Sequence, residues 1–175
     1  NNNTFVITVG AIFSNLCLII GLSFLYKLIK NKFNSKIAQL TVLGILTFPT
    51  SFILSSFYTE ALFLMLAILS FYFFEKKQWF KGSITGALMA LSRPLGILIL
   101  VPAGLKMNKE AFRQERPAKF IIQTTTKLLL IPVGFFLFLH FAYLERGSFL
   151  APITTQSSHW NRQFTLPWQT FLQPK

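Results

Sequence analysis

Tyr58, Glu60 and Arg93 are polar residues in apolar surroundings, and their side chains could do chemistry. Tyr58 and Glu60 lie in the run FPTSFILSSFYTEALFLMLAILSFYFF, in which Glu60 is the single charged residue. A tyrosine hydroxyl and a carboxylate both hydrogen-bond to hydroxyl groups, so the pair suits a hydroxyl-rich ligand. The alternative is structural: Thr59 caps a helix, and Glu60 complements the positive end of that helix. The spacing alone is compatible with both.

Arg93 lies in the run SRPLG, which interrupts an apolar stretch from Gly82 to Leu105. A guanidinium presents a planar fork of donors that matches a phosphate group. Pro94 and Gly96 allow the chain to turn beside it. The alternative is that Arg93 lies near a helix end and extends its side chain to the lipid headgroups at little cost.

A third group of polar residues lies in the C-terminal run GSFLAPITTQSSHWNRQFTLPWQTF. Here Trp160 could stack on a sugar face while Gln156 and Arg162 bond its hydroxyls, or the tryptophans could simply form an interfacial belt. We expect neither a metal nor another cofactor, because the sequence has no Asp and its two histidines, His140 and His159, are far apart.

The composition places these residues in a membrane protein. Of the residues, 53% are hydrophobic, and there are 21 phenylalanines in 175 residues with a mean hydropathy of +0.53. A spanning helix needs about 20 mostly apolar residues. The apolar runs are Thr4 to Ile29, Ile37 to Phe57, Ala61 to Phe74, Gly82 to Leu105 and Phe120 to Leu144. We predict an all-α, multi-pass transmembrane helical bundle over residues 1–144, with an extracytoplasmic loop over 145–175.

The basic residues indicate which loops face the cytoplasm. The net charge is +12, and twelve of the 17 basic residues lie in three clusters between apolar runs. Because these cations lie in short connections, they indicate a membrane topology, and we expect no nucleic-acid partner. The clusters are Lys27, Lys30, Lys32 and Lys36; Lys76, Lys77 and Lys81; and Lys106, Lys109, Arg113, Arg116 and Lys119.

The third cluster shares the cytoplasmic side only if the run from Gly82 to Leu105 does not cross the membrane. Two half-helices of about 11 residues each rise about 16 Å, halfway through the bilayer, and can return to the starting face. Backbone that turns at this depth must be buried or line a wet cavity. We therefore predict a re-entrant helical pair with Arg93 in a cavity, and Tyr58 and Glu60 on the extracytoplasmic side.

Four blocks of the sequence form a specific pattern: IFSN at 12–15, FPTSFILSSFYTEALFL at 48–64, WFKGSITGALMALSRPLGILILVP at 79–102 and QSSHWNRQFTLPWQ at 156–169. Together they resemble the GPI mannosyltransferase II (PIG-V) family in its bacterial form. The blocks keep their order and cover nearly the whole chain. The second block and the Gln, Trp, Arg tail are the more specific ones.

The resemblance implies a GT-C fold and a membrane glycosyltransferase. Such an enzyme takes mannose or a similar sugar from a polyprenyl or dolichyl phosphate donor to a lipid, glycan or protein acceptor on the extracytoplasmic side. The implied location is the bacterial plasma membrane, or the endoplasmic reticulum membrane in a eukaryote. Tyr58 and Glu60 would face the sugar or acceptor, and Arg93 the carrier phosphate. Gln156, Trp160 and Arg162 would face the acceptor or donor head.

The sequence departs from the resemblance in one respect. The family's catalytic acid is expected in a Trp-Asp motif upstream of these blocks, and this chain has no Asp. Together with the missing initiator Met, this indicates an internal segment that lacks the catalytic base. A membrane transporter or lipid flippase is the alternative function, since broken helices with buried charges are typical of transporters. A third is a non-catalytic membrane scaffold, in which Glu60 and Arg93 would be dispensable.

Overall fold

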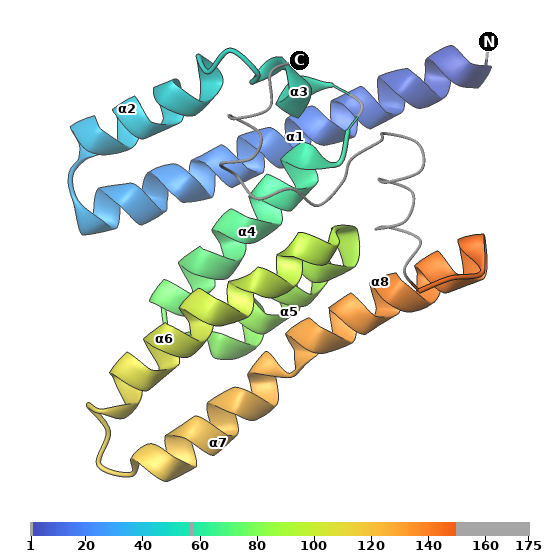
Figure 1. Cartoon of the computed structure of the whole chain (residues 1–175). Helices are drawn as coiled ribbons and strands as arrows, with labels where there is room; N and C mark the ends of the chain where they lie inside the picture. The colour runs from blue at the N-terminus through green and yellow to red at the C-terminus, as the bar shows by residue number, and fades with distance from the viewer. Residues whose placement is uncertain (1, 57, 150–175) are drawn as a thin grey trace, which may run out of the picture. The chain divides into compact units, whose positions relative to one another are not determined.

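The computed structural model describes residues 2–56 and 58–149; over these residues it consists of helices joined by turns and irregular segments and has no strands, in agreement with the predicted all-α class (Figure 1). The chain divides into two units, residues 1–138 and 139–175. The helices are α1 (Asn2–Lys32), α2 (Ser35–Leu46), α3 (Phe52–Ser55), α4 (Glu60–Glu75), α5 (Trp79–Ser92), the 3-10 helix η1 (Pro94–Ile99), α6 (Leu100–Ala111), α7 (Pro117–Leu128) and α8 (Leu130–Arg146). The predicted boundary between residues 144 and 145 stays a prediction.

Two described segments are long and apolar enough to cross a membrane: Thr4–Lys32, and Pro117–Arg146 with α7 and α8 taken together. Their outer faces carry large exposed apolar side chains. On α1, Ile19 is 63% exposed, and on α8 Phe136 is 65% exposed. A water-soluble protein rarely exposes so much contiguous apolar surface, whereas a lipid surround accommodates it.

The prediction of one helix from Ile37 to Phe57 is wrong. Helix α2 ends at Leu46, and the chain continues irregularly to α3. Pro49 accounts for the break, because it has no backbone N–H to donate and disfavours helical geometry at Phe48 before it. A 12-residue helix rises only about 18 Å, too short to span. Because the helix ends here, the segment between α2 and Glu60 can turn and pack against α1.

The interrupted run folds as the predicted helical pair. Arg93 is extended, with φ −154° and ψ 141°, as expected for a residue before proline, and α5 ends there. Gly96 lets η1 return against α5: a Cβ at this position would lie 2.5 Å from the backbone of Met89 and Ala90. Figure 1 shows that α6 runs in the direction opposite to α5. The chain thus reverses at Arg93.

The core of residues 1–138 lies where α4 packs between α1 and α5. One buried cluster joins α4, α5, η1, α6, α7 and α8, with Phe74, Trp79 and Ile131 among its largest members. A smaller cluster between α1 and α4 includes Leu18 and the fully buried Ala61. This packing fixes the ends of α4 against both α1 and the α5–η1 pair.

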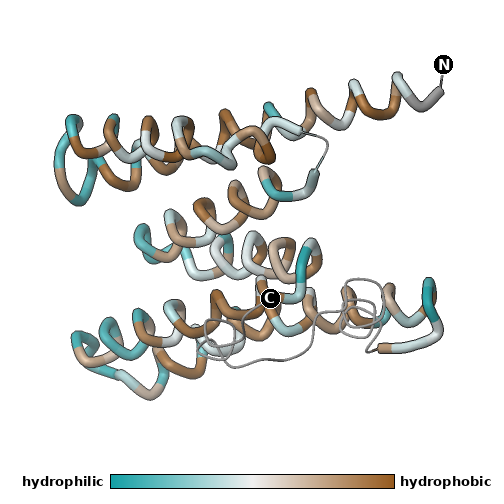
Figure 2. Tube along the Cα trace, turned by 45° about the horizontal axis from the view of Figure 1, so that its top comes forward, coloured by the Kyte–Doolittle hydropathy of each residue, from teal (hydrophilic) through white to brown (hydrophobic). Residues whose placement is uncertain are grey.

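All three basic connections lie at one end of this unit, here called the basic end. Glu75, at the end of α4, forms salt bridges with Lys32 of α1 and with Lys106 of α6. The nitrogen–oxygen distance is 2.8 Å in each. Lys77 pairs with Glu110 at 2.6 Å. In Figure 2 the turns α1–α2, α4–α5 and α6–α7 are hydrophilic, while the helices between their ends are largely hydrophobic. The shared end agrees with the predicted topology; the membrane face that it occupies stays a prediction.

Candidate functional site

The candidate site lies at the opposite end of the same unit, around the start of α4 and the reversal after α5. We call it the Arg93 end and define it as Ser14, Asn15, residues 55–60 except 57, and Arg93. The guanidinium of Arg93 donates to a Glu60 carboxylate oxygen and lies 3.2 Å from the hydroxyl oxygen of Thr59. It also lies over the Phe63 ring, 6.0 Å from the centroid.

Glu60 lies between a charged partner and an apolar cavity. Its Oε1 accepts the bond from Arg93, whereas its Oε2 is buried and has no hydrogen-bond partner among residues 2–56 and 58–149. Burying a carboxylate oxygen without a hydrogen-bond donor costs free energy. A ligand hydroxyl that donates to this oxygen would remove that cost and so bind favourably here. The side chains of Glu60 and Arg93 remain 28% and 37% exposed, which leaves both accessible.

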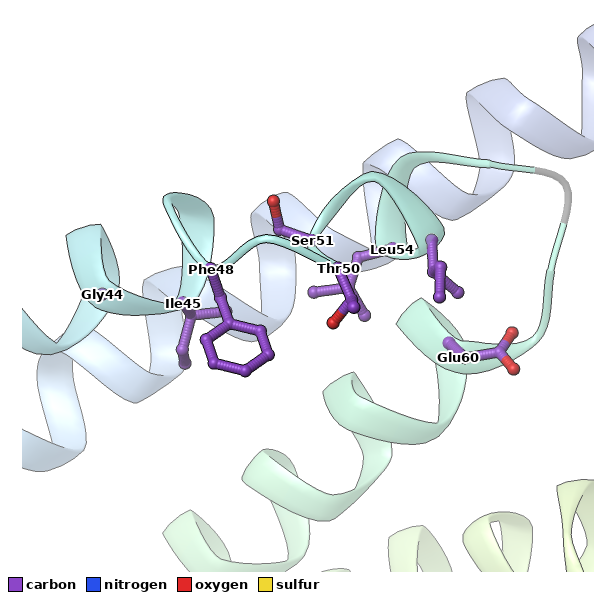
Figure 3. Close-up of a pocket in the computed structure, with 8 residues that line it drawn as sticks. Gly44, Ile45, Phe48, Thr50, Ser51, Leu54 and Glu60 are labelled. Carbon is purple, nitrogen blue, oxygen red and sulfur yellow. The ribbon is translucent and has the colours of Figure 1, made fainter. Parts of the chain in front are cut away.

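The cavity beside Glu60 has a volume of about 340 Å³. Its lining comes from α2, the irregular segment and α3, and from Glu60 across from them; Figure 3 shows the carboxylate directed away from Phe48. The lining residues are Gly44, Ile45, Phe48, Thr50, Ser51, Ile53, Leu54 and Glu60. The cavity is apolar except for Glu60, which pairs with Arg93; a lipid phosphate, which joins a hydrocarbon chain to an anion, has a similar division into apolar and charged parts.

Two residues of α1 hold the segment that precedes Glu60. The buried Ser14 hydroxyl donates to the Tyr58 carbonyl at 3.1 Å. The Asn15 amide donates to the Ser55 carbonyl at 3.2 Å. The sequence interpretation assigned neither residue to the site, although a Ser-Asn pair inside an apolar helix was the available signal. Both are positioning residues for the turn that carries Glu60.

The helix-cap alternative predicts the positions of Thr59 and Glu60 correctly, but the capping hydrogen bond that it implies for Thr59 is not formed. Thr59 is the N-cap residue of α4, and Glu60 is the acidic residue in its first turn, where it complements the positive helix end. The Thr59 side chain makes no capping hydrogen bond, however, and faces Arg93 instead. The first residues of α4 therefore bind Arg93 and so connect α4 to the α5–η1 reversal.

The predicted site residues are brought together only in part. Glu60 and Arg93 are in contact, and Tyr58 lies two residues before Glu60 with its side chain 61% exposed. Gln156, Trp160 and Arg162 lie outside the described residues. No acidic residue lies in the run from Gly82 to Leu105 that contains Arg93, and Glu60 reaches Arg93 from α4. Arg93 is therefore a paired cation.

Comparison with known proteins identifies the family. A family model described as dolichyl-phosphate-mannose-protein mannosyltransferase matches residues 3–143. No curated protein and no solved structure matches the chain. The match shows the broader class of the resemblance, a membrane glycosyltransferase of GT-C type, without confirming GPI mannosyltransferase II. Because the matched residues make up most of the sequence and include both Glu60 and Arg93, the chain belongs to the dolichyl-phosphate-mannose-protein mannosyltransferase family.

Proposed function

We propose that this chain is part of a membrane glycosyltransferase that moves mannose or a similar sugar from a polyprenyl phosphate donor to an acceptor on the extracytoplasmic side. The acceptor is a lipid, a glycan or a protein. The observation that carries the proposal is the Arg93–Glu60 pair beside an apolar cavity, within the residues that match the family. The resemblance to GPI mannosyltransferase II is the reason for proposing mannose as the sugar and the extracytoplasmic side as the place of transfer.

In this proposal Arg93 binds the phosphate of the carrier. Its guanidinium already has Thr59 and Glu60 as partners, and a phosphate oxygen would replace one of them. Stabilising the phosphate as it leaves the sugar lowers the barrier, because charge develops there in the transition state. The cavity from Gly44 to Leu54 would take the first part of the carrier's hydrocarbon chain.

Glu60 and Tyr58 have the complementary role on the sugar or acceptor. The buried Oε2 of Glu60 accepts a ligand hydroxyl, and the exposed Tyr58 hydroxyl can donate to another or accept from it. The resemblance also gives Gln156, Trp160 and Arg162 a role in binding the acceptor or the donor head; these three residues lie outside the described residues. The general base that takes the acceptor proton is expected upstream of this segment, so the residues here bind and orient the reactants.

The test is a transfer assay with the full-length protein in nanodiscs. We expect transfer from polyprenyl phosphate mannose and none from a nucleotide sugar. Arg93→Ala, purified in parallel, serves as the control for contaminating activity. Transfer from the nucleotide sugar alone would contradict the proposal. So would movement of the lipid-linked sugar between leaflets without transfer, which is the flippase result.

A further inference from the structure

A second pocket lies at the basic end, between α6 and α7, and its lining is charged. It has a volume of about 490 Å³ and is separate from the cavity beside Glu60. Its lining is polar and mostly cationic: Arg113, Gln114, Glu115, Arg116, Lys119, Phe120 and Gln123. Nothing in the proposed transfer reaction uses these residues.

The cations of this pocket form no ion pair with the part of the protein that the structure describes. Within the described part of the chain, Glu75 and Glu110 pair with lysines, and none of Arg113, Arg116 and Lys119 takes part in an ion pair. Glu115 is the one acid in the lining, so the pocket carries a formal charge of +2. Two guanidiniums and an ammonium around one concave surface are the donors that a phosphate group requires.

The first turn of α7 and the Phe120 wall of the pocket are also compatible with a bound phosphate group. Helix α7 begins at Pro117, and the first turn of a helix presents N–H groups that have no partner within the helix and attract anions. Phe120 forms one wall and packs edge-on against the buried Trp79, 6.0 Å between ring centroids. The pocket is thus anchored to the core.

We propose that this pocket binds a phosphate group, supplied by an anionic phospholipid headgroup or by free phosphate. Phe112, next to Arg113, is 91% exposed, and an aromatic side chain so placed can enter a bilayer beside the bound headgroup. Basic pockets between membrane helices hold anionic headgroups in this way. The ligand stabilises the α6–α7 turn, and through α6 the Lys106–Glu75 pair.

The test measures binding by the full-length protein to two probes: nanodiscs of phosphatidylcholine with and without phosphatidylglycerol, and inorganic phosphate in detergent. The variant is Arg113→Gln/Arg116→Gln/Lys119→Gln. Its matched control is Lys27→Gln/Lys30→Gln/Lys36→Gln, which removes the same charge from exposed positions of the first basic connection. We expect the pocket variant to lose about tenfold in affinity, and the control to change by less than about twofold.

The two probes distinguish the sources of the phosphate. Loss of phosphatidylglycerol binding alone identifies a lipid headgroup, and loss of inorganic phosphate binding identifies a free-phosphate site; either supports the proposal. An equal loss in the control would show a diffuse basic surface and overturn it, as would no binding of either probe by the wild type. Thermal unfolding in uncharged detergent shows whether the variants remain folded.

Glu115 provides a check in the opposite direction. Glu115→Gln raises the formal charge of the pocket from +2 to +3 without removing a donor. Phosphate affinity should therefore increase about threefold. An unchanged or weaker affinity for both probes would contradict a phosphate in contact with this lining.

Discussion

The basic end and the Arg93 end both hold ion pairs that join separate helices, but their compositions differ. At the basic end, three lysines from three connections pair with Glu75 and Glu110, and the structure shows no ion pair for the other cations over the residues it describes. At the Arg93 end, one arginine pairs with one glutamate beside an apolar cavity, and the second oxygen of that glutamate has no partner within the described residues. Ion pairs of the first kind fasten the connections together. The second kind leaves binding capacity for a ligand.

The α5–η1–α6 reversal supports both ends, because it brings Arg93 to Glu60 and Lys106 to Glu75. Gly96→Ala should therefore give the largest effect. The added Cβ would lie 2.5 Å from backbone atoms of Met89 and Ala90, which cannot move aside as a side chain can. We expect little folded protein by size-exclusion chromatography and a lower midpoint of thermal unfolding.

The control for this substitution is Gly104→Ala in α6. Apart from the nearby backbone of α6 itself, no atom of the described residues lies within 4 Å of the added Cβ there, so the change should be neutral or stabilise the helix by about 0.5–1 kcal/mol. If the two alanine variants unfold alike, the close return of η1 on α5 is not what holds the two ends.

Glu60→Gln and Glu75→Gln compare one carboxylate from each end. At Glu60 we expect transfer per folded molecule to fall about tenfold with little change in unfolding, because a charged acceptor for ligand and Arg93 is lost. At Glu75 we expect the reverse: a lower thermal midpoint and unchanged turnover, since two lysines lose their partner. Equal effects on turnover would remove the distinction between the ends.

The acidic residues of the basic end should also determine how stability depends on pH. Burial raises the pKa of Glu75, but the bonds from Lys106 and Lys32 outweigh it and hold this pKa below its usual range. The Lys77 bond lowers the pKa of Glu110 against the effect of burial. A carboxyl whose pKa is lowered by folding stabilises the protein above its unfolded pKa of about 4.3, and this contribution is lost as the pH falls through the folded pKa.

The thermal midpoint should accordingly fall steeply below about pH 4.3 in the wild type. Glu75→Gln/Glu110→Gln should start lower at neutral pH and fall less on acidification. Glu115→Gln, which removes a glutamate without an ion pair among the described residues, should follow the wild-type curve. A double variant with the wild-type slope would show that the lysine pairs contribute nothing to stability.

Thr59→Val tests the weakest contact of the Arg93 end. The hydroxyl oxygen lies 3.2 Å from one guanidinium nitrogen and 3.4 Å from another, and valine removes it while keeping the side-chain shape. A neutral acceptor of this kind orients the arginine, so the KM for the donor should rise about threefold. Thr47→Val is the control and should leave KM unchanged, because the Thr47 hydroxyl donates to the Leu43 carbonyl of its own helix.

The sequence predicts the fold where a local cause determines it. Apolar length predicts α1 and α4, and the proline and glycine of SRPLG predict the reversal at Arg93. The break at Pro49 had the same kind of signal, but apolar content outweighed it in the prediction. The pairing of Arg93 with Glu60 could not be predicted, because the residues are 33 positions apart and meet only through the packing of α4 on α5. The same applies to Ser14 and Asn15, whose partners are backbone carbonyls of a distant segment.

The central claim is that Arg93 holds the phosphate of a lipid-linked sugar, and Arg93→Lys tests it most directly. Lysine keeps the charge that Glu60 needs but lacks the planar fork that can bond Glu60 and a phosphate together. The measurement is the initial rate of transfer from polyprenyl phosphate mannose over a range of donor concentrations, with full-length protein in nanodiscs. The account predicts an unchanged thermal midpoint and a KM for the donor raised about tenfold. A donor KM and rate within about twofold of the wild type would contradict it, because Arg93 would then only tie α4 to the α5–η1 reversal.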